Sequence, residues 1–204
     1  MIKVYWLDCS PLLDPAELER ALPHLYEERR TKTLRLQTAE RRAQSAGAGL
    51  LLRHLFGDAA YAYGVNGKPY LKEKNDLYFT LSHSKHYVIC AVADCEIGAD
   101  IEPSSSARPA VLRRCFSPEE QAWIGEDPKR FARLWTMKEA YMKLTGTGLS
   151  VPAKDIRLPI PPQENYDPTN RCYWIFPEFS VPISVCANES AHLEMIPINI
   201  KDLL

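Results

Sequence analysis

The chain has 204 residues, of which 46% are hydrophobic and 25% are charged, an ordinary composition for a globular protein that buries a core. Its 25 basic and 26 acidic residues leave a formal net charge of −1, so overall charge gives no attraction to nucleic acid or to an anionic membrane. There is no run near the roughly 20 apolar residues of a membrane span, no signal-peptide pattern, and no metal-finger spacing among the six cysteines. We therefore expect a cytoplasmic protein without nucleic-acid or membrane partners.

The first hundred residues predict a strand, three helices and then a strand-rich segment. Residues 2–7 are rich in β-formers, Asp14 and Pro15 begin a helix, and Gly57 ends the third helix. Strands at 77–81, 87–93 and 97–102, separated by short turns, predict an antiparallel meander. The remaining expected features are helices at 25–36 and 38–56, a turn at 66–69, and a connection at 82–86.

A linker-like stretch at 103–109, with prolines and serines, marks an expected boundary between an N-terminal half (1–103) and a C-terminal half (104–204). Segment 87–94 resembles segment 182–189, and each half places a long helix before its strands, so an internal duplication is one interpretation. Beyond the linker we expect helices at 111–116, 118–124 and 130–144, a loop at 159–168, and strands at 172–176, 181–187 and 193–200.

The helix expected at 130–144 carries two polar residues one turn apart, Glu139 and Lys143. Such a pair is most often a solvated surface contact. Upstream, Asp100 and Glu102 are two apart on an expected strand, so both carboxylates leave the same face, and they repel unless a cation or proton lies between them. A hydrated strand end is the ordinary interpretation, but with Glu139 the three acids form a candidate Mg²⁺ site, beside which Lys143 would neutralise phosphoryl charge.

Basic residues are concentrated between positions 29 and 53, where seven arginines and lysines face a single acid, Glu40. This pattern suits a polyanionic small molecule, and equally a basic helix face without a ligand. Ser82, His83 and Lys68 are further potential phosphate donors, although a lone histidine is more often structural and a lysine in a Gly-Lys-Pro turn more often faces solvent.

Four motifs occur in a fixed order: Gly98-x-Asp100-x-Glu102, Phe116-Ser-x-x-Glu120, Trp135-Thr-x-Lys138-Glu139-Ala140-x-x-Lys143 and Gly146-x-Gly148-Leu149. This series resembles the 4′-phosphopantetheinyl transferases of the surfactin-synthetase-activating type. The upstream Gly67-Lys68-Pro69 and Phe79-x-x-Ser82-His83-Ser84 are similar to the same family's remaining motifs. The resemblance covers about residues 25 to 150.

The resemblance implies an enzyme that moves the phosphopantetheine arm of coenzyme A to a serine of an apo acyl, peptidyl or aryl carrier protein, with Mg²⁺ as cofactor. It implies an α+β fold of two pseudo-symmetric halves, each a small antiparallel sheet packed with a long helix, with the active site between them. One chain would supply both sides of that site, so we expect a monomer. Carriers of fatty-acid, polyketide, non-ribosomal peptide and lysine pathways fit the sequence equally.

The same resemblance implies roles for individual residues. Asp100, Glu102 and Glu139 would bind Mg²⁺, Glu139 would also be the general base, directly or through water, and Lys143 would bind the transferred phosphate. Lys138 would support the site, and residues 146–177 would receive the carrier. The expected coenzyme A contacts are Arg29, Lys32, Arg42, Ser45, Lys68, Ser82, His83 and Lys143. Thr80 and Gln44 depart from the family's frequent Asn and Arg at their positions.

Two other functions fit part of this pattern. Another Mg²⁺-dependent phosphoryl or nucleotidyl transferase can use the same three acids, but the Gly-x-x-x-x-Gly-Lys-Ser/Thr loop that would favour it is absent from the sequence. A non-catalytic module that binds carrier protein or coenzyme A would not need Glu139 and Lys143, which are both present. The sequence therefore favours the transferase.

Overall fold

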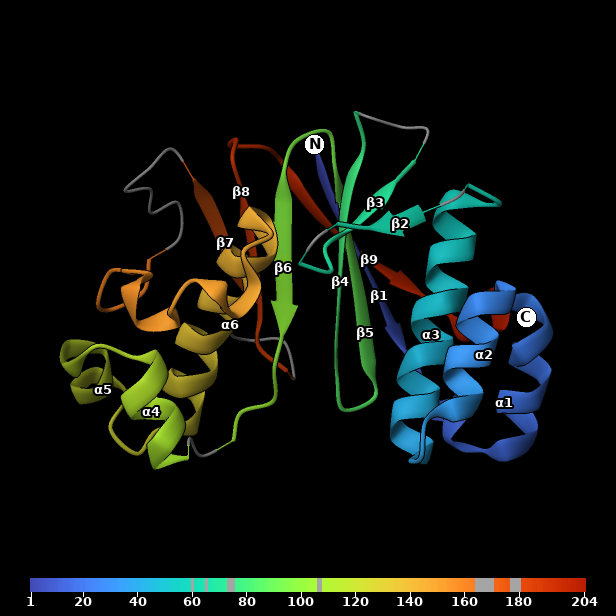
Figure 1. The fold of residues 1–204 in the computed structure, drawn as a ribbon, viewed down its shortest axis with the longest axis horizontal. Helices are drawn as coiled ribbons and strands as arrows, with labels where there is room; N and C mark the ends of the chain where they lie inside the picture. Colours follow the sequence, from blue (N-terminus) through green and yellow to red (C-terminus); the bar gives the residue numbers. More distant parts are fainter. Residues whose placement is uncertain (60, 65, 73–75, 106–107, 164–170, 177–180) are drawn as a thin grey trace.

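The computed structural model describes residues 1–59, 61–64, 66–72, 76–105, 108–163, 171–176 and 181–204. Within them, two larger sheets lie next to each other, with helices on their outer sides (Figure 1). The first sheet has the strand order β4-β5-β1-β9, in which β1 is antiparallel to β5 and parallel to β9. Its strands are β1 (Ile2–Asp8), β4 (Tyr78–Ser84), β5 (Tyr87–Ala93) and β9 (Leu193–Ile198).

The second sheet places β8 between β6 and β7, antiparallel to both. Every residue of β6 and β8 is buried, which explains why these segments read as nearly unbroken apolar runs. A smaller antiparallel pair, β2 with β3, lies beside the first sheet. The strands are β6 (Ile97–Ile101), β7 (Cys172–Phe176), β8 (Ile183–Ala187), β2 (Tyr61–Tyr63) and β3 (Pro69–Leu71).

The predicted meander is only half correct. The hairpin of β4 and β5 forms as expected, but β6 leaves the first sheet and pairs with β8 in the second. The predicted connection at 82–86 is also shorter in the structure, because Ser82 to Ser84 continue β4 and only Lys85 and His86 form the turn. Lys85 has a positive φ of 51°, as tight hairpin turns require. Ser82 and His83 are therefore held on a strand.

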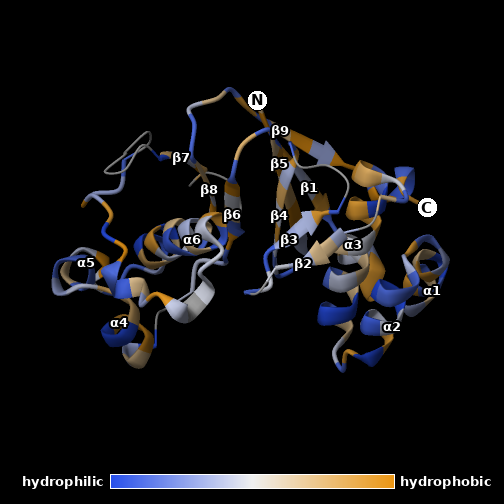
Figure 2. Cartoon of the chain, turned by 45° about the horizontal axis from the view of Figure 1, so that its top comes forward, coloured by the Kyte–Doolittle hydropathy of each residue, from blue (hydrophilic) through white to orange (hydrophobic). Residues whose placement is uncertain are grey.

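Of the three predicted N-terminal helices, the first begins at Pro15 and the third ends at Phe56 as expected, whereas the second is shorter than predicted and spans Glu27–Arg35. Asp14 caps α1 by accepting a hydrogen bond from the Ala16 amide, and Thr38 caps α3. α3 presents small buried residues to the first sheet, and Gly57 ends it. In Figure 2 the outer helices α1 and α2 carry much of the hydrophilic colour, as expected of solvent-facing helices. The helices are α1 (Pro15–Ala21), α2 (Glu27–Arg35) and α3 (Ala39–Phe56).

Of the C-terminal helices, α6 packs on the second sheet and α5 packs against α6. α5 begins with a complete capping box between Ser117 and Glu120. α6 starts two residues earlier than predicted because Asp127 caps it through the amides of Lys129 and Arg130, and it ends at Gly146, whose φ is +65°. The helices are α4 (Pro109–Cys115), α5 (Pro118–Ile124) and α6 (Pro128–Thr145); short 3-10 turns are Ser10–Leu13, Leu22–His24, Gly148–Ser150, Ala153–Asp155 and Ile200–Asp202.

Strand β6 runs directly against α6. A Cβ atom at Gly98 would lie 2.0 Å from the Ala140 carbonyl oxygen and 2.3 Å from the Leu144 amide nitrogen. Only a residue without a side chain permits this approach. It sets Asp100, two residues along β6, beside the part of α6 that carries Glu139 and Lys143.

Each sheet contains strands that are far apart in the sequence. β9, from the C-terminal end, completes the first sheet, and β6, from before the expected boundary, forms an edge of the second. The echoing segments at 87–94 and 182–189 form β5 and β8, inner strands of different sheets. The α+β class is confirmed, while the pseudo-symmetry and the boundary at residue 103 stay predictions. Within the described residues, no helix is both long and apolar enough to cross a membrane.

Candidate active site between the two sheets

Asp100 lies at the centre of a polar cluster in which three elements meet. Its Oδ1 atom accepts a hydrogen bond from the Ser82 hydroxyl at 2.7 Å and contacts the Lys143 ammonium at 2.6 Å. Ser82 comes from β4, Asp100 from β6 and Lys143 from α6. Asp100 is only 3% exposed, so these two partners supply its polar contacts in place of water.

The other carboxylate oxygen of Asp100 has no partner. Oδ2 is buried and makes no hydrogen bond in the described part of the chain. An unsatisfied buried charge of this kind is costly unless something else binds it. A cation with a preference for hard oxygen ligands suits such an atom.

The other two predicted acids share the electrostatic environment of Asp100. Burial, then the charges of Asp100 and Glu139, raise the pKa of Glu102 to about 7, against an opposing effect of Lys143 and a hydrogen bond from Trp135. Burial and Asp100 likewise raise the pKa of Glu139, while Lys143 opposes the shift. The three acids and the lysine that the sequence singled out therefore lie within one interacting group.

The carboxylates of Asp100, Glu102 and Glu139 interact electrostatically but are not positioned to coordinate one metal ion together. Among the described residues, no three His, Cys, Asp or Glu side chains are placed to hold a metal ion as they stand. Mutual repulsion of like charges favours this spacing. Cation binding by all three acids would require Glu102 or Glu139 to change its side-chain conformation.

A cavity of about 270 Å³ opens beside this group. Glu139 and Lys143 form one wall, from α6, and Thr80 on β4 lies opposite them. The Lys143 side chain is 27% exposed, so its ammonium group is reachable from the cavity. The lining residues are Asn66, Gly67, Lys68, Pro69, Thr80, Leu81, Glu139, Met142, Lys143, Gly146 and Gly148.

Two residues of the connection between β2 and β3 donate hydrogen bonds to the C-terminal end of α6. The Asn66 amide donates to the Gly146 carbonyl at 2.7 Å, and the Lys68 ammonium donates to the Leu144 carbonyl at 2.7 Å. These carbonyl groups belong to the end of a helix, where partners within the helix run out. The interpretation of Lys68 as a solvent-facing turn residue is therefore wrong.

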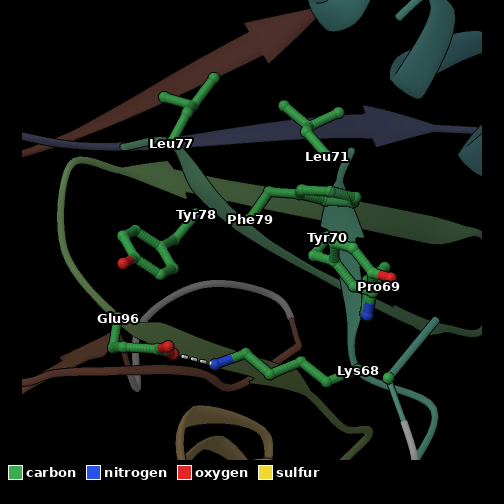
Figure 3. Close-up of a pocket in the computed structure, with 9 residues that line it drawn as sticks. Lys68, Pro69, Tyr70, Leu71, Leu77, Tyr78, Phe79 and Glu96 are labelled. Carbon is green, nitrogen blue, oxygen red and sulfur yellow. Dashed lines mark hydrogen bonds and ion pairs between the residues drawn. The ribbon is translucent and has the colours of Figure 1, made fainter. Parts of the chain in front are cut away.

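Lys68 also forms an ion pair with Glu96. Figure 3 shows this pair at one side of a second cavity, also of about 270 Å³, whose apolar lining includes Leu71, Leu77 and Phe79. A contact between Lys68 and coenzyme A stays a prediction, and such a contact would compete with Glu96.

Of the predicted coenzyme A contacts not yet described, His83 and Lys32 are exposed to solvent. His83 is exposed on β4, and its pKa is lowered by partial desolvation and then by the positive charge of Lys143, with Lys32 contributing further in the same direction. Lys32 is exposed on α2, so both cations lie within electrostatic range of His83.

The other predicted coenzyme A contacts are Arg29, Arg42 and Ser45, and each makes contacts within the N-terminal helices or with the adjoining β2–β3 pair. Arg29 is buried, and its Nη2 donates to the Tyr63 hydroxyl at 3.3 Å. The Arg42 Nε donates to the Leu36 carbonyl at 2.7 Å. Ser45 is buried and hydrogen-bonded to the hydroxyl of Thr33 at 2.8 Å. These contacts organise α2 and α3, and coenzyme A binding by these residues stays a prediction.

Lys138, next to Glu139, is fully buried. Its ammonium pairs with Glu120 at 2.9 Å and donates to the carbonyl groups of Ala153 and Ile156 at 2.7 and 2.8 Å. It also lies 5.3 Å from the centre of the Phe116 ring, a cation–π distance. Lys138 thus ties α5 and the segment after α6 to the helix that carries Glu139.

Two contacts at the site were not anticipated from the sequence. Trp135 hydrogen-bonds to Glu102, one of the predicted metal ligands. The Gln44 side-chain amide donates to the Lys85 carbonyl at 2.6 Å and so holds the β4–β5 turn. Neither partner is near in sequence, and pattern alone does not reveal such pairs. The segment 146–177 that was assigned to the carrier protein lies partly outside the described residues.

Comparison with known proteins identifies the family of this chain. The profile of the 4′-phosphopantetheinyl transferase superfamily matches residues 96–188, which include β6 and α6. A 4′-phosphopantetheinyl transferase of Bacillus subtilis is 30% identical over 167 residues, covering 74% of this chain and 73% of that protein. The 4′-phosphopantetheinyl transferase psf-1 of Bacillus pumilus is 31% identical, covering 73% and 71%. The 4′-phosphopantetheinyl transferase HetI of a Nostoc strain is 34% identical, covering 61% and 60%.

Proposed function

The chain belongs to the 4′-phosphopantetheinyl transferase superfamily, and on that premise we propose that it transfers 4′-phosphopantetheine from coenzyme A to a serine of an apo acyl, peptidyl or aryl carrier protein. The serine Oγ bonds to the phosphorus on the pantetheine side of the pyrophosphate as the bond from that phosphorus to the bridging oxygen breaks. The bridging oxygen leaves with the adenosine portion, the serine proton passes to the general base, and the products are the holo carrier and adenosine 3′,5′-bisphosphate. The observation that carries the proposal is the convergence of Asp100, Glu102, Glu139 and Lys143 beside one cavity.

We assign Mg²⁺ to Asp100, Glu102 and Glu139. The donor set fits, because all three are hard oxygen ligands and Asp100 carries a buried oxygen without a partner in the described part of the chain. Burial, and after it the charge of Asp100, raises the pKa of both glutamates, and a bound cation would offset that cost. When bound, the ion would neutralise charge on the pyrophosphate.

Glu139 is the proposed general base for the carrier serine. It lines the cavity and would accept the serine proton directly or through a water molecule. Lys143, one helical turn away, would bind the phosphate being transferred and stabilise the leaving group. Its ammonium group has three N–H donors and can turn from the Asp100 oxygen toward a phosphate oxygen.

The basic N-terminal half would bind the remaining charge of coenzyme A. We place its 3′-phosphate near His83 and Lys32, with Arg29, Arg42, Ser45 and Lys68 as further predicted contacts. The exposed arginines of α2 would also attract a carrier protein of acidic character. A cytoplasmic monomer is the proposed working form, because one chain supplies β4, β6 and α6 to the site.

Intact-mass spectrometry of an apo carrier protein, incubated with the enzyme, coenzyme A and Mg²⁺, tests this function. We expect the carrier to gain about 340 Da, one phosphopantetheine arm, and the gain to vanish with EDTA. Glu139→Ala should abolish the gain, whereas Glu119→Ala, at an exposed position of α5, should leave it unchanged. Coenzyme A binding without transfer to any of several carrier classes would refute the proposal and favour a binding module.

A further inference from the structure

The Ser82 hydroxyl is bound to Asp100, although its motif predicts a contact with a coenzyme A phosphate. The residue is 7% exposed, and its hydroxyl donates to Asp100 at 2.7 Å. Donor and acceptor lie on β4 and β6, which belong to different sheets. A hydroxyl committed to a buried carboxylate supports that carboxylate, and it does not serve as a phosphate donor.

The two donors at Asp100 differ in how firmly they are held. Both contact Oδ1, which leaves Oδ2 without a partner. Lys143 reaches Oδ1 through a long, partly exposed side chain, which can move to a substrate phosphate. Ser82 reaches it from a short side chain on a paired strand opposite Ile89. When Lys143 leaves, Ser82 remains as the donor that fixes the rotation of the carboxylate.

We propose that Ser82 is a positioning residue, which holds Asp100 by Oδ1 so that Oδ2 is presented to the divalent cation. The inference rests on the proposed function only in taking Asp100 as a ligand of that cation. Partners that orient a metal ligand commonly determine metal affinity almost as strongly as the ligands do.

Mn²⁺ binding, followed by electron paramagnetic resonance of the free ion in the presence of saturating coenzyme A, tests the role. We expect Ser82→Ala to weaken Mn²⁺ binding by roughly tenfold to a hundredfold. Ser82→Thr keeps the hydroxyl and suits a strand, so it should restore most of the affinity. Ser84→Ala is the matched control, because Ser84 is equally buried two residues along the same strand, and it should bind Mn²⁺ as the native protein does.

A second titration separates positioning from phosphate binding. Coenzyme A binding in EDTA, measured by calorimetry, should be unchanged in Ser82→Ala. Unchanged Mn²⁺ affinity in Ser82→Ala, or a loss of coenzyme A affinity in EDTA, would overturn the inference. Absence of carrier modification by a native protein that still binds Mn²⁺ would refute the proposed function alone.

Discussion

Gly98→Ala should damage both stability and catalysis, because it separates the strand and the helix that share the site. The new methyl group would lie 2.0 Å from the Ala140 carbonyl oxygen and 2.3 Å from the Leu144 amide nitrogen, whereas ordinary contacts begin at about 3.5 Å. Both neighbours are backbone atoms of α6, so no side chain can rotate away and the helix must withdraw by more than about 1 Å. Overpacking typically costs 1–3 kcal/mol, and we expect about 3 kcal/mol here.

Thermal unfolding and carrier modification measure the two effects. A loss of about 3 kcal/mol lowers Tm by about 6–12 °C in a chain of this size, and displacement of Asp100 from Glu139 and Lys143 by about 1 Å should lower the transfer rate about a hundredfold. Gly64→Ala is the control, because the nearest atom to its added Cβ is 3.6 Å away. A Tm of Gly98→Ala within about 2 °C of the native value would show that β6 and α6 do not pack this closely.

Two further substitutions test the electrostatics of the site. The pKa of Glu102, about 7 in the folded protein against 4.5 for an ordinary glutamate, means that the folded state binds this proton more tightly, so metal-free protein should lose stability as pH rises from about 4.5 to about 7. Glu102→Gln should raise Tm at about pH 7.5 and leave it nearly unchanged near pH 4.5; an equal shift at both pH values would contradict this. Lys138→Met should destabilise the protein by about 3–5 kcal/mol in denaturant unfolding, since it leaves the buried Glu120 carboxylate unpaired, and adding Glu120→Gln should recover part of the loss. If the free energy of unfolding of Lys138→Met lay within about 1 kcal/mol of the native value, the ion pair between Lys138 and Glu120 would not be needed for stability.

The positions of most elements could be predicted from local sequence. Asp14, Thr38 and Gly57 delimit helices because their side chains or backbone freedom satisfy the helix ends, and those interactions act within a few residues. The strands at β1, β5 and β7 likewise follow from local composition. The strand β6 itself was predicted, but its pairing was not, because the partner of a strand is chosen by packing across the whole chain and not by its neighbours in sequence.

The candidate site shows the same division. The spacing of Asp100 with Glu102, and of Glu139 with Lys143, places each pair on one face of its own element. Only the fold decides that these two faces meet, and that the Ser82 hydroxyl reaches Asp100. The assignment of Ser82 to a phosphate contact followed its motif, whereas the tertiary structure gives its hydroxyl to Asp100.

The sequence by itself determined the family, the class of fold and the acidic residues of the site, because ordered motifs and side-chain periodicity are properties of local segments. The tertiary structure alone decided which oxygen of Asp100 is left without a partner, how far the pKa of Glu102 rises, and that the turn at Asn66 and Lys68 caps the helix carrying Glu139. Each of these depends on groups that are distant along the chain. Burial and charge act through space, and only the folded arrangement of β4, β6 and α6 sets those distances.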